Sequence, residues 1–180
     1  KMLGARAGFL GVFGNDLYGP ILEDTLKTLG VDISHCRHEI GSSGYSLVEL
    51  KEDGDRVFLD WNQDGVTERY PIEFTKEELD YIQSYQAVSV GRCASVAVEK
   101  IRKMKEHGIN VCYDFHEIYT EEDIREIAPL LRYAFFSCSH LTEEEIRHNL
   151  KVAVEQGAGI AIGTRGPLSV FAYDGKRYYE

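Results

Sequence analysis

The second half of the chain repeats one pattern, in which a short apolar run alternates with a segment of helical periodicity. Helices are predicted at residues 75–84, 95–107, 120–131 and 142–156, and strands at 87–90, 109–113, 134–136 and 159–163. Strands that alternate with single helices pair in parallel through right-handed crossovers. The sequence therefore predicts an α/β fold with a doubly wound, mostly parallel sheet and helices on both faces.

The first half of the chain is organised differently. Residues 7–13 are a short apolar run that predicts a buried strand, and residues 17–29 predict a helix that ends at Gly30. Two apolar-alternating runs, 45–50 and 56–61, are joined by a polar turn that contains glycine, which predicts a β-hairpin. Both runs keep polar residues on one side, so we expect this hairpin to cover something rather than lie inside a parallel sheet.

The chain of 180 residues is long enough to bury one core, and we interpret it as a single partial domain, residues 1–180, with a lid insertion at about 38–70. A second hairpin is predicted at residues 170–179, around Asp174-Gly175. Because the sequence starts at Lys1 and stops inside this hairpin, we expect both ends to have been cut from a longer protein.

Glycines cluster between residues 8 and 20, where a strand is predicted to meet a helix. The dinucleotide fingerprint G-x-G-x-x-G is not met, because Gly8, Gly11 and Gly14 are three residues apart. A P-loop is not met either, because Pro20 and Ile21 stand where it needs Lys and Ser or Thr. The stretch instead predicts a strand-turn-helix junction, capped by one of the two residues that follow the third glycine.

Composition excludes several classes of function. The net charge is −10 and there is no basic stripe, so we expect no nucleic-acid partner. The four cysteines form no C-x-x-C pair, which argues against a disulfide or zinc framework and favours a cytoplasmic location. His35, Cys36 and His38 lie close together, but structural zinc needs four ligands at defined spacings. No apolar run approaches the roughly 20 residues of a membrane span.

The predicted topology indicates where a ligand would bind. In open parallel sheets, ligands bind beyond the carboxyl ends of the strands. The segments that qualify are residues 14–16, 91–92, 114–117, 137–140 and 164–166. A hairpin inserted before the later strand-helix units would act as a lid over these loops and exclude water from a small polar substrate. This layout is kinase-like, although many binding proteins share it.

Several motifs resemble those of one enzyme family. Residues 4–19, followed by a helix and Leu29-Gly-Val-Asp32, resemble the first signature of the pfkB, or ribokinase-like, carbohydrate kinases. Gly54-Asp55-Arg56 in the hairpin turn and residues 157–166 are similar to later motifs of that family. Within the family, residues 37–49 and 132–139 look most like the fructoselysine kinases.

The resemblance implies ATP-dependent phosphorylation of a hydroxyl of a sugar or sugar-amine such as fructoselysine, with Mg²⁺ accompanying the nucleotide and a lid closing over the sugar. The family's catalytic Asp lies in a GAGD motif, which we expect beyond Glu180, so no catalytic residue is assigned in this chain. The alternatives are a catalytically incompetent ribokinase-like module that binds sugar or dimerises, and an unrelated doubly wound ligand-binding domain. The exposed edges of the lid invite homodimerisation.

Site residues are carried over position by position from the resemblance and the topology. The candidates are Asp16, Tyr45, Glu49, Arg92 and Asp114 for substrate, Ser139, Thr164 and Gly166 for nucleotide, and Glu143 for metal.

Most of these candidates also have a purely structural interpretation. Asp16 is equally suited to cap the first helix, and Tyr45 and Glu49 to pack against the domain or a partner chain. Arg92 fits a surface ion pair as well as a phosphate contact. Gly166 fits a simple chain turn.

Two stretches depart from the family pattern. Residues 137–143 lack the Asn expected near the nucleotide phosphates, so Ser139 with Thr142, or His140 with Glu143, would have to replace it. Residues 114–118 lack the Asn and Arg of the common D.N.R motif.

Overall fold

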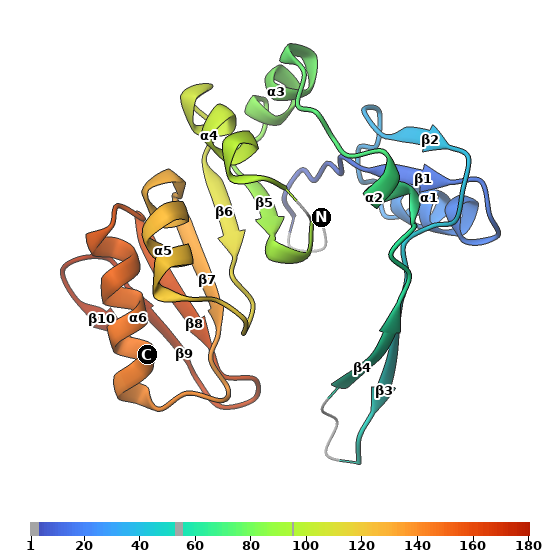
Figure 1. The fold of residues 1–180 in the computed structure, drawn as a ribbon. Coiled ribbons are helices and arrows are strands. Elements are labelled where there is room, and N and C mark those ends of the chain that lie inside the picture. Colours follow the sequence, from blue (N-terminus) through green and yellow to red (C-terminus); the bar gives the residue numbers. More distant parts are fainter. Residues whose placement is uncertain (1–3, 53–55, 95) are drawn as a thin grey trace. The chain divides into compact units, whose positions relative to one another are not determined.

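The computed structural model describes residues 4–52, 56–94 and 96–180. The chain consists of two compact units, Lys1–Glu73 and Phe74–Glu180 (Figure 1). Helices and a mostly parallel sheet confirm the α/β class.

Unit 1 is built on a short parallel pair of strands. Strand β1 (Val12–Gly14) pairs with β2 (Arg37–Glu39), and helix α1 (Tyr18–Thr28) lies between them in sequence. The strand predicted at 7–13 is shorter than expected, because only an isolated bridge between Gly8 and Asp32 precedes β1. The apolar stripe of α1 is exposed in the described chain, with Ile21 at 55% and Leu22 at 47%.

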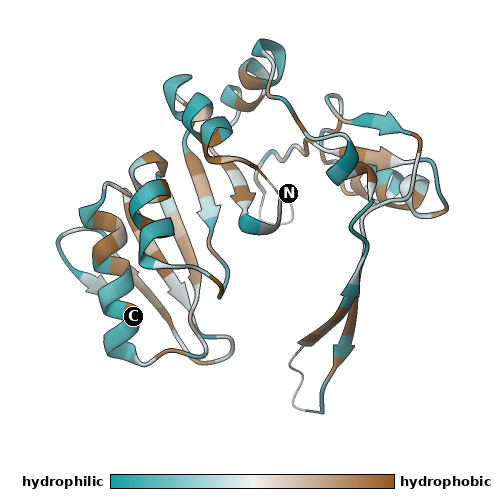
Figure 2. Cartoon of the chain, in the orientation of Figure 1, coloured by the Kyte–Doolittle hydropathy of each residue, from teal (hydrophilic) through white to brown (hydrophobic). Residues whose placement is uncertain are grey.

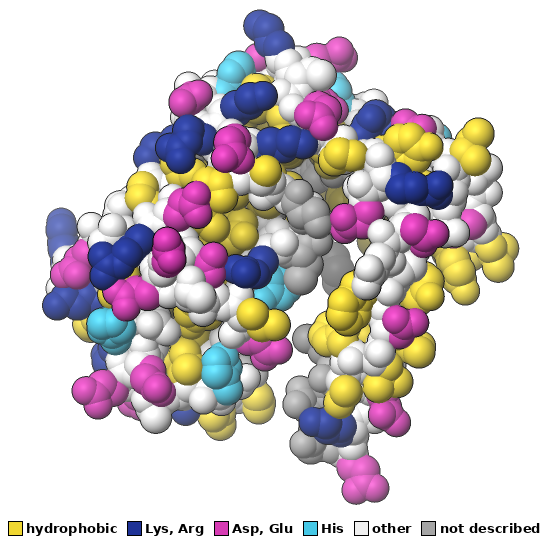
Figure 3. Space-filling model, in the orientation of Figure 1, with side chains coloured by type: hydrophobic (Ala, Val, Ile, Leu, Met, Phe, Trp, Pro, Cys, Tyr) yellow, Lys and Arg dark blue, Asp and Glu magenta, His cyan; other side chains and the backbone are white. Residues whose placement is uncertain are grey.

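The predicted hairpin is confirmed. Strand β3 (Ser46–Leu50) pairs antiparallel with β4 (Arg56–Trp61), with an irregularity between Leu47 and Val48, and the short helix α2 (Val66–Arg69) follows. The hairpin extends from the rest of unit 1 as a separate two-stranded ribbon (Figure 1). Hydrophobic stretches lie along the hairpin (Figure 2), and apolar side chains are visible on its surface (Figure 3). The large apolar side chains that are at least half exposed are Leu47, Leu50, Phe58, Leu59 and Trp61.

Unit 2 contains a six-stranded sheet in the order β10-β9-β8-β7-β6-β5. Its strands are β5 (Val88–Gly91), β6 (Val111–Asp114), β7 (Tyr133–Ser137), β8 (Ile160–Thr164), β9 (Val170–Tyr173) and β10 (Tyr178–Tyr179). Strands β5 to β8 are parallel, while β9 and β10 are antiparallel. The helices are α3 (Lys76–Gln83), α4 (Val98–Glu106), α5 (Glu121–Ile127) and α6 (Glu143–Glu155), with 3₁₀ turns η1 (Arg92–Ala94) and η2 (Ala128–Leu130).

Helices α4, α5 and α6 cover one face of this sheet (Figure 1). Strands β5 to β8 follow in sequence order across the sheet, so right-handed crossovers all fall on the same side. Burial alternates accordingly: Phe136 and Ala161 are at most 1% exposed, whereas Phe135 and Ile162 on the other face are only partly buried. Helices were expected on both faces, and among the described elements of unit 2 these three lie on one.

Local sequence signals fix most helix starts. A capping box between Thr75 and Glu78 opens α3, where a helix start was predicted, and equivalent boxes open α5 at Thr120 and α6 at Thr142. Helix α4 begins at Val98, later than predicted, because residues 92–94 form a 3₁₀ turn first.

The turn of the C-terminal hairpin is tied by one carboxylate. Asp174 accepts hydrogen bonds from the backbone N–H groups of Lys176 and Arg177 at 2.9 Å and from the Tyr179 hydroxyl at 2.7 Å. These bonds, that of Tyr179 above all, lower the pKa of Asp174 to about 2. Gly175 has φ +88°, as the predicted Asp-Gly turn requires.

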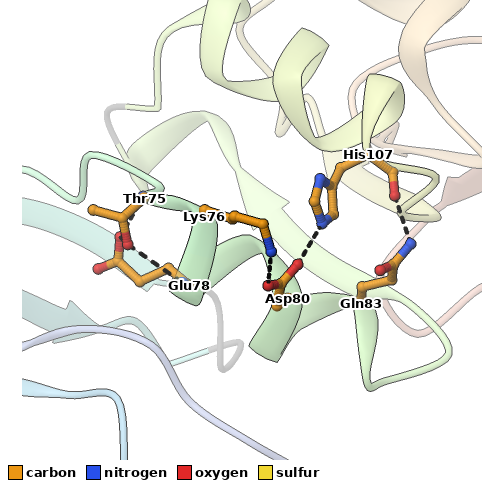
Figure 4. Close-up of polar contacts among 6 residues, drawn as sticks. All are labelled: Thr75, Lys76, Glu78, Asp80, Gln83 and His107. Atoms are coloured by element: carbon orange, nitrogen blue, oxygen red, sulfur yellow. Dashed lines mark hydrogen bonds and ion pairs between the residues drawn. The ribbon is translucent and has the colours of Figure 1, made fainter.

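Polar contacts join α3 to the end of α4 (Figure 4). Asp80 pairs with Lys76 at 2.5 Å and with His107 Nε2 at 2.9 Å. Gln83 donates to the backbone carbonyl of His107 at 2.6 Å. The hydrogen bond from Lys76, and then that from His107, lowers the pKa of Asp80 below its ordinary value of 3.8.

We expect Asp80→Asn to reduce the stability of the chain slightly at neutral pH. A carboxyl whose pKa is lowered by folding stabilises the protein above its unfolded pKa, and this contribution is lost as the pH falls through the folded pKa. The difference between variant and parent should therefore shrink below about pH 3.8 in urea unfolding curves. The matched control is Glu126→Gln on the exposed surface of α5, and a difference that stays constant with pH would contradict the assignment.

Candidate functional site

The candidate residues of unit 2 gather at the carboxyl ends of its parallel strands. Gly91 at the end of β5 is in register with Asp114 at the end of β6. Ser137 at the end of β7 is in register with Thr164 at the end of β8. The segments of unit 2 that the topology rule singled out therefore lie at one edge of its sheet, and their role in ligand binding stays a prediction.

Asp114 lies beside a histidine that was not among the candidates. Its Oδ1 accepts a hydrogen bond from the backbone N–H of His116 at 2.8 Å, and its Oδ2 lies 4.0 Å from His116 Nε2. Both side chains are nearly half exposed, and a Cβ added to Gly91 would lie 3.4 Å from His116 Nε2. A carboxylate and an imidazole at a strand end can bind a hydroxyl group or a cation.

His116 has φ +58°, the left-handed region that non-glycine residues enter uncommonly. The one feature of the sequence that could have marked His116 as a candidate is its position two residues after Asp114, where the family pattern has Asn.

Arg92 is engaged in an ion pair. Its Nη1 lies 3.3 Å from Oδ2 of Asp123, which belongs to the capping box of α5. The pKa of Asp123 is lowered mainly by the backbone N–H of Thr120, with Arg92 contributing less. Arg92 thus forms a surface ion pair, one of its two expected roles, and a contact between Arg92 and substrate stays a prediction.

The segment after β8 forms an open turn. Gly166 has φ +57°, and a Cβ added there would meet nothing within 4 Å. The backbone N–H of Leu168 donates to the carbonyl of Arg165 at 3.2 Å, which closes the turn. Thr164 is exposed and its hydroxyl lies 3.4 Å from the carbonyl of Phe136. Both nucleotide candidates of this segment are thus accessible from solvent.

Glu143, the candidate for metal, has a counter-ion. Its Oε1 lies 3.5 Å from Nη1 of Arg165, whose side chain is only 19% exposed and lies over the ring of Phe171. Ser139 and His140 are exposed in the turn before α6. Within residues 4–52, 56–94 and 96–180, no three His, Cys, Asp or Glu side chains are grouped to hold a metal ion.

The site in unit 1 centres on Asp16. Its Oδ1 accepts from the backbone N–H groups of Tyr18 at 3.1 Å and Gly19 at 2.9 Å, at the start of α1. It also accepts from the Ser43 hydroxyl at 2.8 Å, and its Oδ2 accepts from the Ser43 backbone N–H at 2.7 Å. The Ser43 backbone bond is the main cause that lowers the pKa of Asp16. Asp16 therefore caps the helix and also holds a distant loop.

Asn62 joins this loop to the hairpin. Its Oδ1 accepts from the backbone N–H of Tyr45 at 2.8 Å, and its Nδ2 donates to the carbonyl of Ser43 at 2.9 Å. The side chains of Tyr45 and Glu49 themselves are exposed. Sequence reasoning missed Ser43 and Asn62, because neither belongs to a motif and their partners are distant in sequence.

Three side chains near the start of β2 do not form a metal site. His38 pairs with Glu23 at 2.9 Å, and the Cys36 thiol donates to the carbonyl of Phe9. His35 contacts Ser34 instead. Cys36, Cys112 and Cys138 are free thiols, while the side chain of Cys93 and residues 53–55, with Gly54 and Asp55 of the family motif, lie outside the described part.

Two glycines of the glycine-rich stretch are required by close backbone approach. A Cβ added to Gly19 would lie 1.9 Å from the carbonyl oxygen of Gly14, and one added to Gly14 would lie 2.6 Å from that of Gly41. These contacts agree with a strand-turn-helix junction and leave no room for side chains.

We expect Gly19→Ala to destabilise unit 1, because overpacking against backbone typically costs about 1–3 kcal/mol. Gly44→Ala is the matched control, since its Cβ would lie 3.3 Å from the movable side-chain oxygen of Thr67. Urea unfolding should show a lower midpoint for Gly19→Ala than for the control. Equal midpoints would show that the junction can relax.

Solved structures share this arrangement of elements. The Arabidopsis thaliana ribokinase complexed with ribose and ATP superimposes with a TM-score of 0.75 at 16% identity, covering 97% of this chain and 60% of that one. A putative ribokinase II from E. coli in complex with ATP and Mg²⁺ gives a TM-score of 0.72 at 18% identity, covering 98% and 62%. The chain thus has a ribokinase-like fold.

The family follows from the sequence match. The model of the pfkB family carbohydrate kinases matches residues 1–180, so the chain belongs to that family. It is 28% identical over 180 residues to the fructosamine kinase FrlD of Bacillus subtilis (strain 168), covering 100% of this chain and 63% of that protein. It is 30% identical over 179 residues to the fructoselysine 6-kinase of Escherichia coli (strain K12), covering 98% and 66%. The chain therefore spans somewhat less than two thirds of these relatives.

No helix in the described part of the chain is both long and apolar enough to cross a membrane.

Proposed function

We propose that the protein containing this chain is an ATP-dependent kinase that transfers the γ-phosphoryl group to a hydroxyl of a sugar or sugar-amine such as fructoselysine. The observation that carries the proposal is the pfkB family match over the whole chain, together with relatives named as fructosamine and fructoselysine kinases. An enzyme that draws on cellular ATP would work in the cytoplasm, where we place it.

The carboxyl edge of the unit 2 sheet supports the division of roles. Asp114 and Arg92, at the ends of β6 and β5, would bind substrate, while Thr164, Gly166 and Ser139 would approach the nucleotide. Asp16, Tyr45 and Glu49 of unit 1 would serve the sugar side. The exposed positions of Thr164 and Ser139 and the open turn at Gly166 favour such approach.

Mg²⁺ would be held mainly by the nucleotide phosphates. Glu143, whose Oε1 lies 3.5 Å from Arg165, would contact the ion through one of its waters, since Mg²⁺ commonly keeps several waters in such sites. The ion would neutralise charge on the transferred phosphoryl group. Around it, the chain's own residues would orient the sugar hydroxyl and exclude water.

The catalytic base is not assigned within these residues. The sequence contains Gly157-Ala-Gly-Ile160 but no Gly-Ala-Gly-Asp, the motif that carries the base in the family it resembles. We therefore propose that the base comes from outside these 180 residues. The second candidate function, a sugar-binding or dimerisation module without catalysis, rests on the same missing motif.

A coupled assay of ADP release separates these functions. The longer protein should consume ATP with fructoselysine and Mg²⁺, whereas the 180-residue chain alone should not. In the longer protein, Asp114→Asn should lower kcat/KM about tenfold or more, because a hydrogen bond to a charged group contributes about 1.5–3 kcal/mol. Glu126→Gln is the control. A longer protein that binds sugar yet transfers no phosphate would favour the module.

We further propose that the hairpin mediates a homodimer. Val48, Leu50, Phe58 and Trp61 fall on the same face of β3 and β4 by their register. Leu50 is 71%, Phe58 61% and Trp61 57% exposed, so these side chains are not covered within the described chain (Figure 3). A contiguous exposed apolar face of this kind is typical of an interface.

We expect the double variant Phe58→Ser, Trp61→Ser to weaken dimerisation at least tenfold, since burying one large apolar side chain contributes about 1.5–3 kcal/mol. Sedimentation velocity across a concentration series measures the change. Leu17→Ser, at a position 75% exposed on the loop before α1, is the control. A dimer that persists unchanged in the double variant would locate the interface elsewhere.

A further inference from the structure

We propose that Asp16, Ser43 and Asn62 form a hydrogen-bonded network, the hairpin-base network, that sets the direction in which the hairpin extends from the rest of unit 1. In this role Asp16 is a positioning residue that acts on the substrate through the hairpin. The kinetic part of the inference rests on the proposed function, whereas the structural part does not.

The first link joins α1 to the loop before the hairpin. Asp16 receives two backbone N–H groups at the start of α1 and both the N–H and the hydroxyl of Ser43, at distances from 2.7 to 3.1 Å. Ser43 is only 6% exposed, and both of its bonds to the carboxylate are partly buried. Charge-assisted hydrogen bonds are stronger than neutral ones, and shielding strengthens them further.

The second link joins that loop to both strands. Asn62 donates to the carbonyl of Ser43 and accepts from the N–H of Tyr45, while its own backbone N–H donates to the carbonyl of Tyr45 at 3.3 Å. These bonds extend the ladder beyond the last paired residues, Ser46 and Trp61. The two ends of the hairpin are thus fixed to each other and to Asp16.

The backbone around the network has little room to shift. A Cβ added to Gly65 would lie 3.1 Å from the Cα of Gly44, so the entering and leaving chain segments touch. The N–H of Val66, a fully buried residue, donates to the carbonyl of Ser42 at 2.9 Å. Beyond this base the hairpin exposes its side chains, so its orientation depends on the base.

The Asp16 carboxylate already accepts several hydrogen bonds, which argues against Asp16 as a simple sugar ligand. Its Oδ1 already accepts three hydrogen bonds, and its Oδ2 accepts one. A sugar hydroxyl could use only the remaining lone pair of Oδ2 without displacing Ser43. The carboxylate therefore contributes chiefly by holding the segment 43–50, which carries Tyr45 and Glu49.

Amide hydrogen exchange in the longer protein, without substrate, tests the network. Ser43→Ala and Asn62→Ala should each speed exchange of the Tyr45 amide and its hairpin neighbours about tenfold or more. The first removes the hydroxyl bond to the Asp16 carboxylate, and the second removes both side-chain bonds of Asn62. Exchange in unit 2 should not change. The matched control is Asn110→Ala, which removes a similar side-chain bond to a backbone carbonyl, that of Gln86 at 3.0 Å.

Two further variants keep the test decisive if alanine prevents folding. Asn62→Asp retains an acceptor for Tyr45 but loses the donor to Ser43, so it should speed exchange of the hairpin amides relative to the unsubstituted protein. Asp16→Asn should speed hairpin exchange and raise KM for the sugar while leaving KM for ATP unchanged.

Unchanged hairpin exchange in Ser43→Ala and Asn62→Ala would overturn the proposal. A rise in sugar KM in Asp16→Asn without faster hairpin exchange would also overturn it, because direct contact would then explain the effect. If the protein phosphorylates no sugar, the proposed function fails, but the exchange result still decides whether the network holds the hairpin.

Discussion

The structure of unit 2 depends on the burial of one sheet face beneath α4, α5 and α6. Phe115 and Phe136 stack with ring centroids 4.7 Å apart and an interplanar angle of 4°, and Phe171 is equally buried on the same side. This packing holds four parallel strands in sequence order, and parallel order sends all their carboxyl ends to one edge. The candidate side chains of unit 2 lie along one edge because the parallel strands that carry them all end there.

Much of this fold was predictable because its signals are local. Capping boxes, helical periodicity and the Asp174-Gly175 turn each lie within a few residues, and the elements that carry them formed close to the expected positions. Strand β2 was missed because Arg37, His38 and Glu39 have no apolar alternation and are a strand only through β1. The one-sided placement of the helices depends on strand order, which no local pattern encodes.

The positions of the candidate residues could also be predicted from the sequence, whereas their contacts could not. Positions at strand ends could be predicted from topology, and Asp114 and Thr164 lie where that rule puts them. The partners of the charged side chains could not be predicted: Arg92 pairs with Asp123, 31 residues away, and Glu143 with Arg165 across the turn after β8. Such pairs depend on how elements pack, and they decide whether a charge is available for a ligand.

The left-handed backbone of His116 limits which residues can occupy its position. Histidine and asparagine are among the few non-glycine residues that enter this region with some frequency. An Asn two residues after Asp114, as in the family pattern, could adopt the same conformation, so His116 would differ from it chiefly in offering an imidazole in place of an amide. A β-branched or bulky residue here would be strained at φ +58°, so the turn itself limits which side chains can stand beside Asp114.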